Sequence, residues 1–515
     1  MRLEAKLKIL FFTILAIQFA TVISGGSVTF ADALRGLEAM NQFRDGGQFN
    51  WLNYPNTDGA YSFFLSWWTP GQWVIPYLFQ GIGITNLQVI QSCLIISMTS
   101  IGLWGYYRLF THAGFSQTIV WLSMLTIVTN QLFYWHFLMY YGGDLLVFVL
   151  FPFLIDFTLR IIGRLTLVNV LCFILFGLIG FFFKSSWLLL FFATLVFLWF
   201  TAASTIFTIN TRRIILLLVG VFVFSAVYYS FIQFGETPGS SERIDVYGGM
   251  FHDHMGDWFT AFGTPVGIFS RFTMFIQKLS VNISFNLNGL LLIPLLLSIV
   301  LYVSMLKQKR DVYQKLVLIV SLTYFGLMTV LYVLNRAISY EMRHFAIVGF
   351  LFIPIIIHRI SKSNWKKSGL ILCVLISIGD LSLFAVQTYR MEQKHQFIEG
   401  YKVPKEEYDL LKCIIEWDNA TSDALVVSQE YWRPIHFIRK NDKISVMNLT
   451  EKGWEINSGM ELTSKKFVDI QALSKSYVKI LLIEMVDSDQ ISNQFSDYES
   501  EELFGNEIWR VTVFW

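Results

Sequence analysis

Charged residues are scarce in this chain. Asp, Glu, Lys and Arg make up only 15% of its 515 residues, whereas soluble proteins carry about a quarter. Hydrophobic residues make up 54% and aromatic residues 17%, with 49 Phe and 16 Trp. This surplus of apolar side chains excludes an ordinary soluble fold and predicts a membrane protein, with aromatic rings on helix surfaces and in the interfacial belts.

Cysteine and net charge are also low. The four cysteines show no metal-binding or redox spacing, so a disulfide framework is not expected. The formal net charge of +2 gives no sign of a nucleic-acid partner. No internal repeat of the transporter kind is visible in the sequence.

Apolar stretches recur along the chain at the length of roughly 20 residues that a helix needs to cross a bilayer. They lie near residues 8–24, 87–107, 117–136, 145–162, 166–182, 186–202, 214–233, 287–306, 315–333, 345–360 and 368–386. The first is either an uncleaved helix or a signal peptide, because a basic segment precedes it and small residues follow it. The predicted fold class is therefore a polytopic α-helical membrane protein with about eleven transmembrane helices.

Basic residues in the short loops predict the orientation, because they stay on the cytoplasmic side. Alternation of the spans places one set of basic sites on that side: Arg108, Arg160, Arg164, Arg212, Arg213, residues 307–315 and residues 359–367. The outer side then receives loops 25–86 and 234–286, the turn 334–344 and the tail. We expect a multi-pass protein of a bacterial inner membrane, with its tail in the periplasm or outside the cell.

Residues 389–515 differ from the rest of the chain in their mixed charge and short β-rich runs. Strands are predicted at residues 423–429, 443–449, 478–484 and 508–514, and helices at residues 404–417 and 464–474. We therefore expect two domains: a transmembrane domain over residues 1–388 and a small extracytoplasmic α/β domain over residues 389–515. The tail sequence has no glycine-rich phosphate loop and no cluster of metal ligands.

Ionisable residues at the edge of a membrane are costly and are candidate site residues by default. Asp32 follows the first span, Asp144 opens the fourth, and Lys184 lies between the fifth and sixth. Arg336, Arg343 and His344 precede the tenth span. The expected topology gathers all of them at the outer face, whereas the coupling carboxylates of a transporter belong near the midplane.

Several motifs occur in a recognisable order: an acid after the first span, an aromatic and proline-containing interfacial segment at residues 69–77, Asp144, the segment Gly180-Phe-Phe-Phe-Lys-Ser-Ser, and Arg343-His-Phe before a proline-containing span. In these features the chain resembles the GT-C class of membrane glycosyltransferases, in particular protein O-mannosyltransferases and the lipid A aminoarabinose transferase. It departs from them where Ala33 follows Asp32 in place of an Asp-Glu pair, and where Trp68-Thr-Pro-Gly stands for His-Pro-Pro. The resemblance therefore indicates a divergent member and does not identify the acceptor.

The resemblance implies an inverting glycosyltransferase with a polyprenyl-phosphate sugar as donor, a lipid, glycan or protein as acceptor, and membrane lipids around it. Attack on the anomeric carbon needs a carboxylate base, and the departing phosphate needs positive charge. Asp32 is the candidate base, with Asp45 and Asp58 as alternatives. Asp144 has either a substrate role or a helix-capping role.

Lys184 and Arg343 suit the donor phosphate, because ammonium and guanidinium groups both bind phosphate oxygens. Arg336 and His344 are supporting candidates. Each cation could instead extend its charged end toward the interface without binding substrate.

The second outer loop holds His252, His254 and Asp257 close together, a set that could contribute ligands to a divalent metal ion. Two histidines on one strand do not close a metal site, so an acceptor contact or a plain loop remains an alternative. Apart from this possible divalent metal ion, no cofactor is required for the expected reaction.

Three other functions stay open. A polymerase or ligase of lipid-linked glycans would also use an outer loop and arginines. A transporter or flippase of a lipid-linked sugar would need no glycosidic bond formation. A non-catalytic partner subunit would leave the gathered acids idle.

Overall fold

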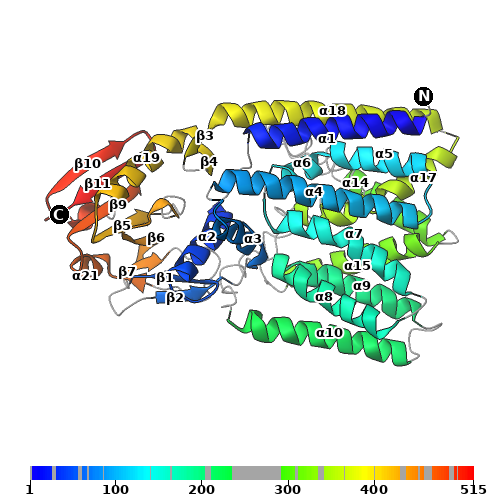
Figure 1. The fold of residues 1–515 in the computed structure, drawn as a ribbon, viewed down its shortest axis with the longest axis horizontal. Helices are drawn as coiled ribbons and strands as arrows, with labels where there is room; N and C mark the ends of the chain where they lie inside the picture. The colour runs from blue at the N-terminus through cyan, green and yellow to red at the C-terminus, as the bar shows by residue number, and fades with distance from the viewer. Residues whose placement is uncertain are drawn as a thin grey trace. The chain divides into compact units, whose positions relative to one another are not determined.

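The structure, a computed structural model, describes residues 3–25, 31–55, 61–65, 69–84, 86–139, 141–162, 165–202, 210–234, 292–307, 311–333, 342–364, 366–398, 401–429, 436–450, 453–456, 467–486, 492–495 and 497–515 (Figure 1). The chain forms two compact units. The first unit comprises Met1–Ser27, Gln91–Ser230 and Ser240–Arg390. The second comprises Val28–Ile90, Phe231–Gly239 and Met391–Trp515.

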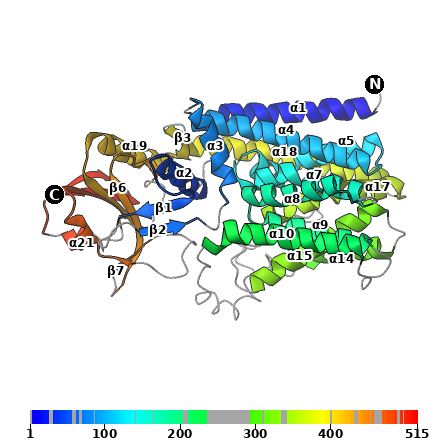
Figure 2. The same cartoon turned by 60° about the horizontal axis from the view of Figure 1, so that its bottom comes forward.

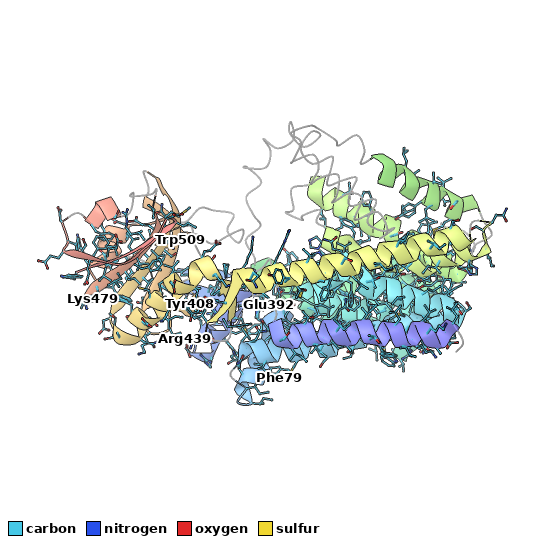
Figure 3. All side chains as sticks on the ribbon, turned by 90° about the horizontal axis from the view of Figure 1, so that it is seen from above. Phe79, Glu392, Tyr408, Arg439, Lys479 and Trp509 are labelled. Atoms are coloured by element: carbon cyan, nitrogen blue, oxygen red, sulfur yellow. The ribbon has the colours of Figure 1, made fainter. Side chains whose placement is uncertain are left out.

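The first unit is helical in its described parts, and Figures 1 and 2 show its long helices running alongside one another. Its helices are α1 (Leu3–Gly25), α4 (Leu87–His112), α5 (Gln117–Thr129), α6 (Gln131–Phe137), α7 (Gly143–Ile161), α8 (Leu167–Phe183), α9 (Trp187–Thr201), α10 (Thr211–Ser230), α14 (Leu292–Lys307), α15 (Val312–Val333), α16 (Met342–Phe350), α17 (Ile353–Lys362) and α18 (Lys366–Lys394). Helices α4 and α18 each extend past the unit's boundary.

Every predicted apolar stretch contains helix. Among the described residues, five helices are long and apolar enough to cross a membrane unaided: Leu3–Ser24, Leu87–His112, Thr211–Phe234, Val312–Leu331 and His344–Lys362. Shorter apolar helices at Gln117–Thr129, Leu167–Phe183 and Trp187–Thr201 accompany them. The chain is therefore an integral multi-pass membrane protein, and the count of about eleven spans stays a prediction.

Two predicted spans are interrupted. The stretch 117–136 divides between α5 and α6 at Asn130, whose side chain accepts a hydrogen bond from the Leu132 amide at 2.9 Å and caps α6. The stretch 345–360 divides between α16 and α17, where Pro354 occupies the first turn of α17. Proline is tolerated there because first-turn amides have no partner within the helix.

Helices α4 and α7 pack closely because glycines of α4 face α7. A Cβ atom on Gly102 would lie 2.5 Å from the Phe148 ring, and one on Gly105 would lie 2.8 Å from Pro152. Small residues let two helix backbones approach, which is how helices associate in membranes. The later glycine of α4, Gly105, meets the later residue of α7, Pro152, so the two helices run in the same direction.

The second unit combines the first outer loop with the tail. Its elements are α2 (Ala31–Arg44), β1 (Trp51–Tyr54), β2 (Tyr61–Phe64), α3 (Gly71–Gly81), the short helix η1 (Ile232–Phe234), β3 (His395–Ile398), β4 (Tyr401–Pro404), α19 (Lys405–Ala420), β5 (Ala424–Gln429), β6 (Asp442–Thr450), β7 (Gly453–Ile456), β8 (Phe467–Val468), α21 (Ile470–Ser474), β9 (Lys479–Met485), the short helix η4 (Ser492–Phe495), β10 (Ser500–Gly505) and β11 (Trp509–Phe514).

A sheet of seven strands lies at the centre of this unit, in the order β10-β11-β9-β5-β6-β7-β8. Strand β5 pairs in parallel with β6 and β9, and the outer pairs are antiparallel. All six residues of β5 are buried, as expected for a central strand covered on both faces. The four predicted strands of the tail are confirmed as β5, β6, β9 and β11.

The helix predicted at residues 404–417 is confirmed as α19. The helix predicted at residues 464–474 is wrong in part, because Phe467–Val468 pairs with β7 as strand β8 and only Ile470–Ser474 is helical. The side chain of Asp469 accepts a bond from the Ala472 amide at 3.0 Å and starts this short helix. Helix and strand patterns are hard to separate over such short segments.

The first loop supplies part of the core of the second unit. One face of the sheet packs Leu425 and Val427 of β5 in the same cluster as Leu37 and Met40 of α2 and Trp73 of α3. On the other face, Leu410 and Ile414 of α19 pack against Val426, with Leu481 and Ile483 of β9. The described part of the first loop is thus a structural layer on the tail's sheet.

Candidate active site

Asp144 and Lys184 form an ion pair inside the first unit. Lys184 Nζ donates to Asp144 Oδ1 in a close contact. The Asp144 side chain is 5% exposed and that of Lys184 is 17% exposed. A buried charge requires a partner, and each group supplies the other's. The sequence had placed both residues at the same membrane face, and the structure brings them into direct contact.

Helix ends position this pair. Asp144 lies in the first turn of α7, and Lys184 is the C-cap residue that follows α8. Partial positive charge collects at a helix N-terminus and partial negative charge at a C-terminus. The carboxylate and the ammonium therefore each lie at the helix end that favours their charge. Their mutual attraction adds to this effect.

Glycines bring the two helix ends together. A Cβ atom on Gly143 would lie 2.9 Å from the Phe183 carbonyl oxygen and 3.2 Å from Cβ of Lys184. A Cβ atom on Gly180 would lie 2.0 Å from the ring of Trp187. Only glycine fits at these two positions without movement of the neighbouring groups.

Trp187 fixes the turn that carries Lys184. Its indole Nε1 donates to the carbonyl of Phe176 at 2.8 Å, and its backbone amide donates to the carbonyl of Lys184 at 3.0 Å. The indole is fully buried. The Gly180-to-Ser186 motif of the sequence is therefore a packed helix end, with its lysine held over the start of α7.

The remaining candidates of the first unit lie near α16. Arg343 belongs to the first turn of α16, and its backbone alone is described. His344 follows it, and its carbonyl accepts a hydrogen bond from the Tyr324 hydroxyl of α15 at 3.1 Å. Arg336 lies outside the described residues. The structure thus places His344 by its backbone and leaves the phosphate-binding role of the arginines a prediction.

The candidate bases belong to the second unit. Asp32 lies in the first turn of α2, where its backbone alone is described. Asp45 follows α2 with a side chain that is 71% exposed and 3.6 Å from Arg44. Asp58 lies outside the described residues. An exposed acid paired with its chain neighbour is held weakly, so the Asp45 carboxylate is little constrained. The gathering of Asp32 with Asp144 at one surface stays a prediction.

The possible metal ligands His252, His254 and Asp257 lie outside the described residues. Within the part of the chain that the structure describes, no group of three or more His, Cys, Asp or Glu side chains could hold a metal ion. A divalent metal therefore remains a sequence-based hypothesis about the second outer loop.

Sequence reasoning missed a buried acid of α2. The Glu38 side chain is 5% exposed, accepts a bond from Lys443 Nζ at 2.7 Å and lies 3.9 Å from Nδ1 of His436. Gln42 Nε2 also donates to Glu38, at 3.3 Å. In the sequence Glu38 is only an acid within a predicted loop. Nothing there indicates that its partner is Lys443, about 400 residues further along the chain.

Comparisons with known proteins give structural likeness only. No protein-family model matches the sequence, and no curated protein matches it. ArnT from Cupriavidus metallidurans in the apo state has a TM-score of 0.54 at 11% identity, covering 99% of this chain and 98% of its own. An Archaeoglobus fulgidus oligosaccharyltransferase has a TM-score of 0.45 at 11% identity, covering 93% of this chain and 70% of its own. The likeness to ArnT extends over nearly the whole chain, which therefore shares the fold of that protein.

Proposed function

We propose that this protein is an inverting glycosyltransferase that moves a sugar from a polyprenyl-phosphate donor to an acceptor on the outer face of the membrane. The observation that carries the proposal is the ion pair of Asp144 with Lys184, held where α7 begins and α8 ends in a GT-C fold. An ammonium that a carboxylate holds in place at a membrane edge is suited to binding an anion beside lipid.

The reaction needs positive charge at the leaving group. A phosphate leaves from the anomeric carbon without an acid because its own pKa is low, and the developing charge is stabilised by fixed cations. Lys184 supplies one such cation. Arg343, with support from Arg336, would supply a guanidinium fork for the remaining phosphate oxygens.

Asp144 acts in this proposal as a positioning residue. An ammonium has three N–H donors, so Lys184 can hold the carboxylate of Asp144 and a phosphate oxygen at the same time. Because the carboxylate already fixes the ammonium, little reorganisation is needed when donor binds. The helix-capping role of Asp144 is compatible with this one, since both place the carboxylate at the N-terminus of α7.

Asp32 takes the acceptor proton as general base. Attack from the face opposite the phosphate forms the new glycosidic bond while the bond to phosphate breaks, which inverts the anomeric centre. The acceptor is a lipid, glycan or protein group on the same side as the tail. We place the protein in a bacterial inner membrane with residues 389–515 in the periplasm or outside the cell.

Release of free polyprenyl phosphate tests the proposal. Purified full-length protein is incubated with a panel of polyprenyl-phosphate sugars, and wild type is compared with Asp32→Asn. The control is Asp45→Asn, which removes the exposed acid that is an alternative candidate for the base in the same segment. Wild type and the control should turn over, and Asp32→Asn should lose about a hundredfold or more of the rate, as expected for a missing general base.

Two outcomes count against the proposal. Full turnover by Asp32→Asn removes Asp32 as the base, and absence of turnover with every donor removes the transferase assignment. Uptake of lipid-linked sugar into proteoliposomes without glycosidic bond formation would identify a transporter instead. If arginine substitutions abolish turnover and aspartate substitutions do not, a polymerase or ligase of lipid-linked glycans is favoured.

A further inference from the structure

A second cluster of charges lies toward the opposite end of α7. Asp156, with a side chain 5% exposed, accepts from Arg160 Nη2 at 2.9 Å and lies 3.3 Å from Arg108 Nε. His112 Nδ1 lies 2.6 Å from its other oxygen. Asp156 is twelve residues beyond Asp144, roughly 18 Å along a helix axis. The two ion-pair sites therefore occupy well-separated levels of the first unit.

The cluster holds more positive charge than its carboxylate needs. One guanidinium would neutralise Asp156, yet two are in contact with it, and His112 adds a further group. The side chains of Arg108, His112 and Arg160 are 39%, 41% and 44% exposed, whereas the carboxylate beneath them is buried. Asp156 thus orients two guanidinium groups that keep a net positive surface.

A cavity adjoins this end of α7. It is a small, open hollow with an accessible volume of about 10 Å³, and Ile161, Ile162, Leu165, Leu198 and Leu216 give it apolar walls. Arg212 lines the same cavity and donates from Nη2 to the carbonyl of Ile162 at 2.9 Å. Arg212 thus adds a further guanidinium group beside apolar side chains at this end of α7.

We propose that this end of α7 binds an anionic phospholipid, with its headgroup phosphate on the guanidinium groups of Arg108 and Arg160. Basic pockets between transmembrane helices bind anionic headgroups in this way. Arginine favours phosphate because its planar N–H groups reach two oxygens at once. The expected topology puts this site in the cytoplasmic leaflet, away from the site proposed for sugar transfer, and binding here requires no turnover.

Lipid binding can be measured on the full-length protein without an activity assay. The protein is reconstituted in phosphatidylcholine nanodiscs with and without phosphatidylglycerol, and bound phosphatidylglycerol is quantified by native mass spectrometry together with the thermal unfolding temperature. Arg108→Gln is the test variant, because Arg160 remains at 2.9 Å from Asp156 and keeps it paired. Lys362→Gln is the matched control, since it removes an exposed cation from the end of α17, on the same expected side.

Wild type and Lys362→Gln should enrich phosphatidylglycerol and unfold at a higher temperature in its presence. Arg108→Gln should bind it about fivefold more weakly, the effect of losing one cation near an anionic surface. Arg108→Lys keeps the positive charge but loses the planar pair of guanidinium N–H donors, so it should recover only part of the binding. Equal enrichment by Arg108→Gln and Lys362→Gln overturns the proposal. Stabilisation by inorganic phosphate equal to that by the lipid, and lost in Arg108→Gln, overturns the assignment to a lipid.

Discussion

Lys443 of β6 donates from Nζ to Oε1 of Glu38 in α2 at 2.7 Å. The bond joins a strand near the C-terminus to a helix near the N-terminus, and both side chains are largely buried, at 13% and 5% exposure. His436 lies beside the same carboxylate. Because Asp32 begins the helix that holds Glu38, the tail fixes the segment that carries the proposed base.

Replacing Glu38 by Gln should therefore destabilise the second unit. Removing one partner of a buried ion pair costs roughly 3–5 kcal/mol, because the other charge stays buried. We expect a lower thermal unfolding temperature and faster proteolysis of the tail in detergent-solubilised protein. Arg44→Gln is the control, since Arg44 and Asp45 form an exposed pair worth about 0–1 kcal/mol. If the two variants unfold alike, the Glu38 pair does not hold the unit together.

The predicted apolar stretches and four tail strands are present because both follow from local pattern. Apolar runs and short β-rich segments are readable without knowledge of the fold. Packing of the first outer loop on the sheet was not readable, because it depends on partners far apart in the chain. Leu37 and Trp73 look like ordinary interfacial residues, yet they are buried in the core that holds Leu425.

The same limit applies to the sites. Asp144 and Lys184 were found because charges at a membrane edge are conspicuous in sequence. Asp156 lies inside the apolar stretch 145–162, and the basic-loop pattern accounts for Arg108 and Arg160 without a carboxylate partner. Its contacts with Arg108 and His112 arise from the parallel packing of α4 on α7, which no sequence pattern announces.

Gly180→Ala should impair donor binding. The added methyl group would lie 2.0 Å from the Trp187 ring, so the turn that carries Lys184 must shift. Gly326→Ala is a matched control in helix α15, because nothing lies within 4 Å of the added atom. That control should be neutral or slightly stabilising, by about 0.5–1 kcal/mol, since alanine favours helix.

Michaelis kinetics with the best donor provide the measurement. We expect KM for the donor to rise in Gly180→Ala and to stay unchanged in Gly326→Ala. A Gly180→Ala enzyme with wild-type KM and kcat would mean that the position of Lys184 does not matter for the donor.

A double-mutant cycle tests the coupling of Asp144 with Lys184. Asp144→Asn leaves a largely buried ammonium without its carboxylate, and Lys184→Met leaves a buried carboxylate without its cation, so each single variant should be destabilised. The double variant removes both charges and should lose less stability than the sum of the two, by about 0.5–3 kcal/mol. Thermal unfolding gives the stability cycle, and donor turnover in each variant gives the functional one. Strict additivity would show that the two groups do not interact.

Cys413 of α19 reports which side of the membrane the tail occupies. Burial and the nearby carboxylate of Glu416 raise the pKa of its thiol. The reactive species is the thiolate, so a raised pKa means a smaller thiolate fraction at neutral pH and slow alkylation. Below that pKa the rate should rise about tenfold for each unit of pH, and Glu416→Gln should accelerate it.

With a membrane-impermeant maleimide, intact cells should label Cys413 when the pH is raised, if the tail is outside as predicted. The variant Cys413→Ser gives the background from Cys93, Cys172 and Cys373, which lie in predicted spans. Labelling that appears only after the cells are opened would place the tail in the cytoplasm. That result would also move Asp144 and Lys184 to the cytoplasmic face and remove the proposed outer reaction, because the same alternation of spans fixes the side of both.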